Sequence, residues 1–469
     1  MNKHIAFIIP DGVGIKNYLY SSLISNLIRN NAKITLIHNF PEKIISEIEE
    51  IHKKKIDSIP LLDYKELLIT KFYRELICLS RLKRNIQKTK NKTLITNWNP
   101  NLNSIKHKFF YLIISLLSSI VFRNYKLILW LEKMQLKTIK SEIYKPVFKN
   151  KIDLIFCTHQ RSLPAIPYIH LAKQFGIKTI GVIFSWDNLP KARLSVRTDE
   201  YVVWSPLMKK DMNFFYPEID IKKIHITGTP QFEFHTKKQF QQSKKDFFRK
   251  YNLDINKKTI CFSGDDRLTS PYDPSFLEDL CSSLNNFPEN ERPQIIFRRC
   301  PVDLSDRYDA ILEKYKDDIA VINPDWRIEN PSQDSSFTMI YPSYNDISLL
   351  VNTCLHSDVV VNLGSTMAHD FAVHNKPCLY VNYNPIKDKN WSVEMIYKFE
   401  HFKSMDSLDA VGWVNEKSDF YQQLKIALEN PQLIAVDKEK WLRRIVEHPL
   451  NKNSINLANL ILDKCTSAI

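Results

Sequence analysis

Short apolar runs alternate with amphipathic stretches of helical length along most of the chain. The run at residues 5–9 leads into a glycine turn and a helical stretch, and a second run follows at 33–38. Apolar runs without polar alternation are typical of parallel strands, which are buried on both faces of their sheet. Strands that alternate with helices in this way predict a doubly wound α/β architecture.

The alternating pattern occurs twice, and a stretch without strand signals separates the two series. The first series closes near Pro230, residues 231–258 are rich in Gln and Lys, and the second series begins at Thr259. A chain of 469 residues is also too long for one ordinary core. We therefore expect an N-terminal domain of residues 1–230, a linker of 231–258 and a C-terminal domain of 259–469.

A basic helical segment of about residues 65–150 interrupts the first series. Residues 81–151 contain 16 Lys or Arg and two acidic residues, so their net charge of +14 equals that of the entire chain. The segment has none of the zinc, RNP or basic-zipper patterns of nucleic-acid binders, and we expect no nucleic-acid partner. The eight cysteines are scattered without CxxC pairs, which indicates neither a zinc site nor a disulfide framework.

Within this segment an uncharged apolar run spans residues 109–122 and is flanked by Lys and Arg. The run is too short to cross a bilayer. It predicts either a buried core helix or a helix lying in a membrane interface, where the basic flanks of 81–151 would contact anionic lipids. The N-terminal apolar run is too short for a signal peptide, so we expect a cytoplasmic protein, at the inner face of the cytoplasmic membrane if the contact exists.

The stretch from Val359 to Val381 reads as strand, turn, helix, turn and strand. Gly364 permits a sharp turn, and Ser365 or Thr366 is suited to cap the following helix. A helix start attracts anions, and Asp370 lies one helical turn further on the same face. A phosphate beside a carboxylate suggests a nucleotide with its ribose, although ordinary caps and a solvated carboxylate would give the same pattern.

Two further strand ends of the C-terminal series are suited to an anion. Gly264 follows one strand and allows close backbone approach, and Arg298 and Arg299 follow the next with guanidinium donors for phosphate. The alternative for the arginines is a surface ion pair. Asp265 and Asp266 are adjacent and do not form a spaced DxD pair, so we expect no metal requirement.

Polar residues also follow the strands of the N-terminal series. The first turn carries Asp11 and Gly12, but Asn17 occupies the third glycine position of the dinucleotide fingerprint, so we expect the turn to line a substrate cleft. His159 follows a later strand. The carboxyl ends of parallel strands gather ligand and catalytic groups at one crevice.

Asp187 follows the next strand, between Trp186 and Asn188. Desolvation beside Trp186 would raise the pKa of Asp187 toward that of a useful base, and Asn188 or His159 would orient the carboxylate. We therefore name Asp187 and His159 as candidate bases and Trp186 and Asn188 as candidate acceptor contacts. The alternative is that Trp186 packs and Asp187 caps the turn.

These motifs carry a resemblance to a known family. The segments 226–230 (ITGTP), 298–301 (RRCP) and 357–366 (SDVVVNLGST), followed by Lys376-Pro377, resemble GT-B glycosyltransferases of bacterial surface polysaccharide synthesis, and are similar also to CDP-glycerol glycerophosphotransferase-like enzymes of teichoic acid synthesis. The resemblance implies two Rossmann-like domains facing across a cleft, with the donor nucleotide on the C-terminal domain and the acceptor and base on the N-terminal one. For the donor it implies Gly264, Arg298, Ser365, Thr366 and Asp370.

The sequence departs from both patterns at identifiable positions. Cys300 precedes Pro301 where the phosphotransferases usually have His, which favours glycosyl transfer. The Glu-x7-Glu pattern of many retaining GT-B enzymes is absent from the stretch around Gly364, so the stereochemistry stays open. The expected activity is transfer of a sugar from a nucleotide-sugar donor to a glycan or lipid-linked acceptor, without a cofactor. Alditol-phosphate transfer, sugar epimerisation and a non-catalytic membrane-associated scaffold of the same fold remain alternatives.

Overall fold

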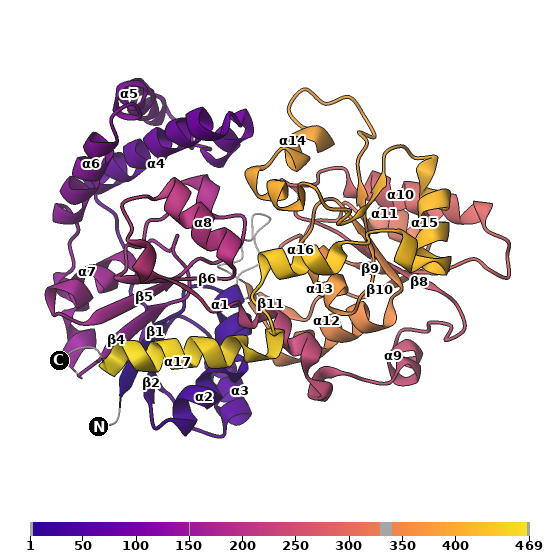
Figure 1. Ribbon diagram of the computed structural model, residues 1–469, viewed down its shortest axis with the longest axis horizontal. Coiled ribbons are helices and arrows are strands. Elements are labelled where there is room, and N and C mark those ends of the chain that lie inside the picture. Colours follow the sequence, from indigo (N-terminus) through magenta and orange to yellow (C-terminus); the bar gives the residue numbers. More distant parts are fainter. Residues whose placement is uncertain (1–2, 150, 329–339, 467–469) are drawn as a thin grey trace.

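The computed structural model describes residues 3–149, 151–328 and 340–466. The protein is built around two large, open parallel sheets (Figure 1). All neighbours in the first sheet pair in parallel. Its strand order is β3-β2-β1-β4-β5-β6-β7. The strands are β1 (His4–Ile8), β2 (Lys33–His38), β3 (Asp57–Pro60), β4 (Leu154–Cys157), β5 (Lys178–Val182), β6 (Glu200–Val203) and β7 (Ile224–Ile226).

The second sheet is also parallel and has the order β10-β9-β8-β13-β14-β15. Its strands are β8 (Thr259–Ser263), β9 (Gln294–Arg298), β10 (Ile319–Val321), β13 (Val359–Asn362), β14 (Cys378–Val381) and β15 (Gly412–Val414). Because a parallel crossover needs a helix between consecutive strands, both sheets are covered by helices. The predicted architecture of two doubly wound α/β domains is confirmed.

Helices cover both faces of the first sheet. One apolar core joins β1 and β2 to helices that include residues such as Leu27 and Ile461, and a second core lies under α7 on the other face. The helices of this domain are α1 (Gly12–Gly14), which continues as the π-helix η1 (Ile15–Leu19), then α2 (Ser22–Arg29), α3 (Glu42–His52), α7 (Ile166–Gln174) and α8 (Pro206–Phe215).

One continuous core extends from first-domain residues such as Trp204 and Met208 to the second sheet and its helices. After the linker helices η6 (Pro230–Thr236) and α9 (Lys244–Lys250), these are α10 (Asp273–Ser283), α11 (Asp309–Lys314), α12 (Tyr344–His356), α13 (Met367–Val373), α14 (Val393–Tyr397), η9 (Glu400–Met405), α15 (Asp419–Glu429) and α16 (Lys438–Ile445). The short hairpin of β11 (Trp326–Ile328) and β12 (Ile340–Pro342) reaches the first domain, where the Tyr20 hydroxyl donates to the Pro342 carbonyl.

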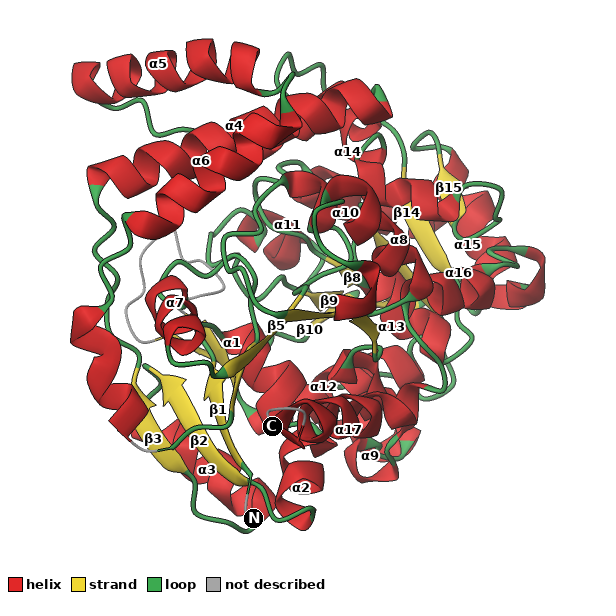
Figure 2. Cartoon of the chain, turned by 60° about the vertical axis from the view of Figure 1, so that its left-hand side comes forward, coloured by secondary structure: helices red, strands yellow, loops and turns green. Residues whose placement is uncertain are grey.

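The basic segment of the first domain is helical, as predicted. It consists of α4 (Leu68–Thr89), η2 (Lys92–Asn97), α5 (Ile105–Val121), α6 (Tyr125–Lys137) and η3 (Glu142–Lys149). Figure 2 shows α5 as the outermost helix, with α4 and α6 between it and the rest of the protein. Arg81 of α4 is buried and forms ion pairs with Glu132 of α6 and with Glu218 of the first domain, which ties the segment to the sheet. No helix within the described ranges is long and apolar enough to cross a membrane.

The last helix, α17 (Asn453–Thr466), differs from the expectation that residues 259–469 form one domain. It returns to the first domain and packs on α2 through Leu457 and Ile461 (Figure 1). Its first residue, Asn453, donates to the Thr229 carbonyl at the start of the linker. Gly228 has a φ of +73°, and a Cβ on it would overlap Asn453. The chain therefore passes between the domains twice, and the two passages are in contact.

Candidate active site

His159 and Asp11 form a hydrogen-bonded pair at the carboxyl edge of the first sheet. They follow the neighbouring strands β4 and β1, and their Nδ1 and Oδ2 atoms lie 2.6 Å apart. Asp11 also accepts from the Gly14 amide and so caps α1. The ring of His159 stacks on Phe184. Its Nε2 is buried and has no partner within the described part of the chain. The carboxylate thus favours the tautomer with the proton on Nδ1 and leaves Nε2 able to accept one.

Asp187, the other candidate base, is held by a lysine. Burial would raise the pKa of Asp187, but the Lys191 ammonium and His401 more than offset it and keep that pKa below its ordinary value. Asn188 donates to the same carboxylate at 2.9 Å, as the sequence suggested. His159 does not orient Asp187, since its Nδ1 contacts Asp11 instead. A carboxylate with a lowered pKa is a weak proton acceptor at neutral pH.

Trp186 links the two domains. Its side chain is buried and lies edge-on to His401, at 4.6 Å between ring centroids, and to His369 at 5.3 Å. His369 lies on α13, and its ring is tilted by 55° against that of Trp441, with 4.2 Å between the ring centroids. Neither of its ring nitrogens has a hydrogen-bond partner among the described residues. Burial lowers the pKa of His369 to about 3, so its ring is neutral. The structure therefore places Trp186 in an aromatic cluster at the domain interface.

Arg298 lies at the seam between the domains. Its Nη2 donates to Asp346 of α12 at 2.9 Å, and both side chains are almost fully buried. Its Nη1 is buried without a partner in the described part of the chain. Lys16, from the first domain, lies near this pair. Burial has the largest effect on the pKa of Lys16 and leaves it below its ordinary value, although Asp346 raises that pKa; Arg298 lowers it further. Among the described residues the seam thus contains one buried guanidinium donor without a partner, on Arg298, and the basic side chain of Lys16 near it.

Asp370 is bound by the linker. Its Oδ1 is 2.9 Å from Nε2 of His235, and His235 Nδ1 is 3.0 Å from Nε2 of His374. Burial, together with His235 and Lys376, lowers the pKa of His374 to about 3. The carboxylate that the sequence associated with a ribose therefore already has a protein partner, although Asp370 also attracts Lys16 across the seam.

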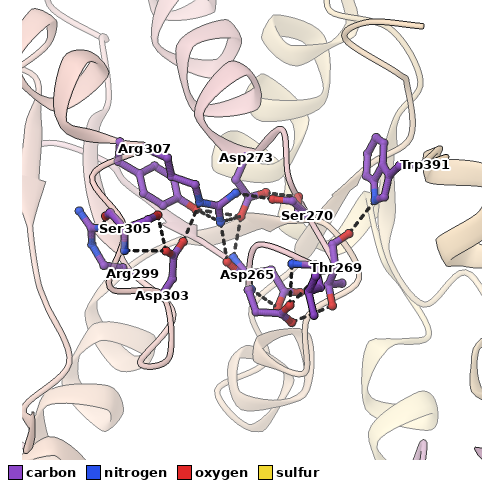
Figure 3. A network of polar contacts seen from close by, with 12 residues as sticks. Asp265, Thr269, Ser270, Asp273, Arg299, Asp303, Ser305, Arg307 and Trp391 are labelled. Carbon is purple, nitrogen blue, oxygen red and sulfur yellow. Dashed lines mark hydrogen bonds and ion pairs between the residues drawn. The ribbon is translucent and has the colours of Figure 1, made fainter. Parts of the chain in front are cut away.

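Arg299 belongs to a separate polar network (Figure 3), and Gly264 lies beside Tyr308 of the same network. Arg299 donates to the Ser305 carbonyl and lies over the ring of Tyr308. Successive residues at a strand end point to opposite sides, and for this reason Arg298 and Arg299 do not converge. A Cβ at Gly264 would lie 2.7 Å from the Tyr308 hydroxyl, so the protein itself fills the space beside this glycine.

Carboxylates surround the same strand end. Burial, followed by repulsion from Asp266 and Asp273, raises the pKa of Asp265 well above its ordinary value. Asp273 accepts from the Asp265 amide and from Tyr308, and Arg307 donates to the Asp265 carbonyl. Over the ranges that the structure describes, no group of three or more His, Cys, Asp or Glu side chains is arranged to hold a metal ion.

The turn after β13 has the expected sharp form. Gly364 has a φ of +71°, and the Ser365 amide donates to the Asn362 side chain at 2.9 Å. Ser365 Oγ accepts a long hydrogen bond of 3.4 Å from Met367 at the start of α13, and no hydrogen bond is formed by the Thr366 side chain within the described chain. Both residues are half-buried, so they remain partly accessible.

Four residues of this region were not singled out from the sequence: Lys16, Lys191, His235 and Asp346. Lys16 had a usable signal, because it follows the first strand and its glycine turn. Lys191 lies four residues after Asp187 in the same loop, which is also a readable spacing. His235 and Asp346 meet their partners only through tertiary contacts, and no local pattern indicates them.

Comparisons with known proteins were informative only at the level of structure. No protein-family model and no curated protein matches the sequence. One similar solved structure is a glycosyltransferase from Rickettsia africae ESF-5, with a TM-score of 0.53 and 10% sequence identity over 98% of this chain and 99% of that one. A second is UDP-GlcNAc 2-epimerase from Neisseria meningitidis bound to UDP-GlcNAc, with a TM-score of 0.53 and 12% identity over 99% of this chain and 100% of that one. A third is the wall teichoic acid polymerase TagF, with a TM-score of 0.51 and 12% identity over 100% of this chain and 90% of that one. At such identities the likeness shows the fold, which is GT-B.

Proposed function

We propose that the protein is a glycosyltransferase that moves a sugar from a nucleotide-sugar donor to a glycan or lipid-linked acceptor in cell-surface polysaccharide synthesis. The proposal starts from the GT-B fold, which this chain shares with a glycosyltransferase, with a UDP-GlcNAc 2-epimerase and with TagF. Because one fold serves several chemistries, the argument for transfer has to come from the site.

The observation that carries the proposal is an unused guanidinium donor at the seam, beside a second basic residue from the other domain. The buried Nη1 of Arg298 lacks a partner in the described chain, and Lys16 approaches it from the other domain against the cost of desolvation. A diphosphate bound between them would satisfy both groups, and its negative charge would raise the pKa of Lys16 again. Ser365 and Thr366 follow β13, which β8 separates from the strand of Arg298, and in this proposal their hydroxyls donate to another part of the same donor.

The base in this proposal is His159, positioned by Asp11. An acceptor hydroxyl gives its proton to Nε2 of His159 and its oxygen bonds to the anomeric carbon. The bond from that carbon to the diphosphate oxygen breaks at the same time, and the nucleoside diphosphate leaves with the electron pair. Arg298 and Lys16 stabilise the charge on the leaving group. Asp187 acts as a fixed ionised group that holds Lys191 in the acceptor loop.

A thermal-shift panel with one seam variant tests the proposal. We expect a nucleotide sugar to raise the melting temperature of the wild-type protein and Lys16→Gln to weaken its affinity at least tenfold, because a phosphate contact is lost. Lys43→Gln, an exposed lysine of α3, is the matched control and should bind as the wild type does. If no nucleotide sugar raises the melting temperature at any workable concentration, the proposal fails.

Alditol-phosphate transfer is the second candidate, because TagF shares the fold over the whole of this chain. Product analysis separates the two reactions. Release of CMP from a CDP-alditol would indicate phosphate transfer, and release of a nucleotide from a sugar donor would indicate glycosyl transfer. A non-catalytic scaffold would bind neither donor. Its His159→Asn variant would support polymer synthesis as well as the wild-type protein does.

A further inference from the structure

The outer face of α5 is apolar and exposed. Ile105, Phe109, Leu112, Leu116 and Ile120 are 85%, 65%, 55%, 63% and 69% exposed, respectively. Their spacing of three or four residues places them in one stripe along the helix. The opposite face, with Tyr111, Ile114, Ser118 and Val121, is buried against α4 and α6. Isolated exposed apolar side chains are ordinary, but a continuous stripe on an outermost helix marks a contact surface (Figure 2).

Basic residues border this stripe on both sides. Taking about 100° per residue, Lys106 and Lys108 lie about 80° to either side of the centre of the stripe. Both lysines are exposed, and α5 contains no acidic residue. Arg123 and Lys126, just beyond the C-terminal end of α5, are exposed as well. An apolar stripe between lysines is the pattern of a helix that lies in the plane of a membrane interface.

We propose that the outer face of α5 docks on an anionic lipid bilayer, with the helix parallel to the membrane and the stripe inserted below the headgroups. The charge decides between this occupant and a second copy of the chain. In a parallel pair of α5 faces Lys106 and Lys108 would lie near the same lysines of the other copy, and in an antiparallel pair near its Arg123 and Lys126, so like charges would repel in either arrangement. Anionic headgroups would neutralise the same lysines. At 17 residues α5 is about 25 Å long. A helix that lies parallel to the membrane does not have to span it, so this length is sufficient for the docking.

The attachment of α5 would fix the position of the catalytic cleft relative to the membrane. The basic helical segment that carries α5 also contacts the second domain, where Asn91, just after α4, donates to the Lys398 carbonyl and to Glu400. Glu400 begins η9, the helix that carries His401, and His401 packs on Trp186. The bilayer proposal itself requires no sugar chemistry, so it stands or falls independently of the proposed transferase activity.

Vesicle co-sedimentation of the full-length protein tests the docking. We expect binding to vesicles of phosphatidylcholine with about one third phosphatidylglycerol, and much weaker binding to pure phosphatidylcholine. Leu112→Ser/Leu116→Ser should weaken binding at least tenfold, because the inserted apolar surface is lost. Leu433→Ser/Val436→Ser, at two comparably exposed apolar positions of the second domain, is the matched control and should bind normally.

A charge variant completes the test. Lys106→Gln/Lys108→Gln should weaken binding to the anionic vesicles about fivefold per lysine at low salt and should lose this difference at high salt. Circular dichroism and the melting temperature verify that each variant is folded. The proposal is overturned if anionic vesicles do not bind the wild type, if Leu112→Ser/Leu116→Ser binds as tightly as the wild type, or if sedimentation shows that the α5 face holds a dimer whose formation excludes lipid.

Discussion

Replacing Arg298 by methionine removes a guanidinium from a buried ion pair and keeps most of the volume of the side chain. The side chains of Arg298 and Asp346 are 6% and 2% exposed, so little water reaches the carboxylate that is left behind. Removing one partner of a buried pair costs about 3–5 kcal/mol. Asp346 keeps two donors, the Asp325 amide at 3.0 Å and Trp326 Nε1 at 2.9 Å, and for this reason we expect about 3 kcal/mol, at the lower end.

The loss of stability should depend on pH in a defined direction. In the wild type, burial raises the pKa of Asp346, but Arg298 and Lys16 more than offset it and hold that pKa below its ordinary value. The stabilisation from the depressed pKa is therefore present above the unfolded-state pKa, and it is lost as the pH falls through the folded-state value. In Arg298→Met the burial effect is no longer offset by the guanidinium, so the pKa of Asp346 rises and the folded variant takes up a proton more readily. The destabilisation should be largest at neutral pH and should shrink below about pH 5.

Urea denaturation followed by tryptophan fluorescence measures the effect at neutral pH and at about pH 4.5. The double variant Arg298→Met/Asp346→Asn serves as the comparison, because it removes the uncompensated charge and keeps an acceptor oxygen for one of the two N–H donors, which bond to different carboxylate oxygens of Asp346. We expect it to recover at least half of the stability lost by Arg298→Met at neutral pH. An equal loss at both pH values, or a double variant no more stable than the single one, would refute the buried-charge argument.

Three further predictions concern the site. Asp11→Asn keeps an acceptor for the α1 cap but no longer favours the reactive tautomer of His159. Turnover should therefore fall about 100-fold or more, while donor affinity, measured by titration, stays within about threefold. Full turnover by this variant would exclude His159 as the base. Treatment with a chelator should leave turnover within about twofold, and a loss that Mg²⁺ restores would contradict metal-independent transfer. Gly364→Ala should lower the free energy of unfolding by about 1–2 kcal/mol, because φ is +71° there and the new Cβ would lie 2.8 Å from Phe402; unchanged stability in urea denaturation would show that the turn relaxes.

The alternation of apolar runs and helical stretches was sufficient to predict two parallel sheets and the helical segment that interrupts the first of them. Strands such as β13 are buried on both faces, and their consecutive apolar residues indicate this in the sequence. The return of α17 to the first sheet was not predictable in the same way. Its apolar residues Leu457 and Ile461 are as suitable for one domain as for the other, and only their tertiary contact with the core that contains Leu27 of α2 places them on the first domain.

The site was predictable where it depends on strand order and not where it depends on side-chain direction. His159 and Asp11 follow neighbouring strands, so their proximity follows from the topology. Arg298 and Arg299 are adjacent in sequence, yet one reaches Asp346 and the other reaches Ser305. The partner of Asp370 is His235 of the linker, and such a contact exists only after both domains have folded.

The two passages of the chain between the domains have a mechanical consequence. They meet where Asn453 bonds to the Thr229 carbonyl and packs against Gly228, so in the described chain the two covalent connections between the domains lie side by side. This place would be the pivot of any rotation between the domains, and such a rotation would have to open the buried contacts of Trp186 with His369 and His401. It would change the separation of Lys16 and Arg298 without bending either sheet. Any side chain larger than hydrogen at position 228 should therefore stiffen or displace the pivot, and its effect would appear as altered opening of the seam while the chemistry of His159 is untouched.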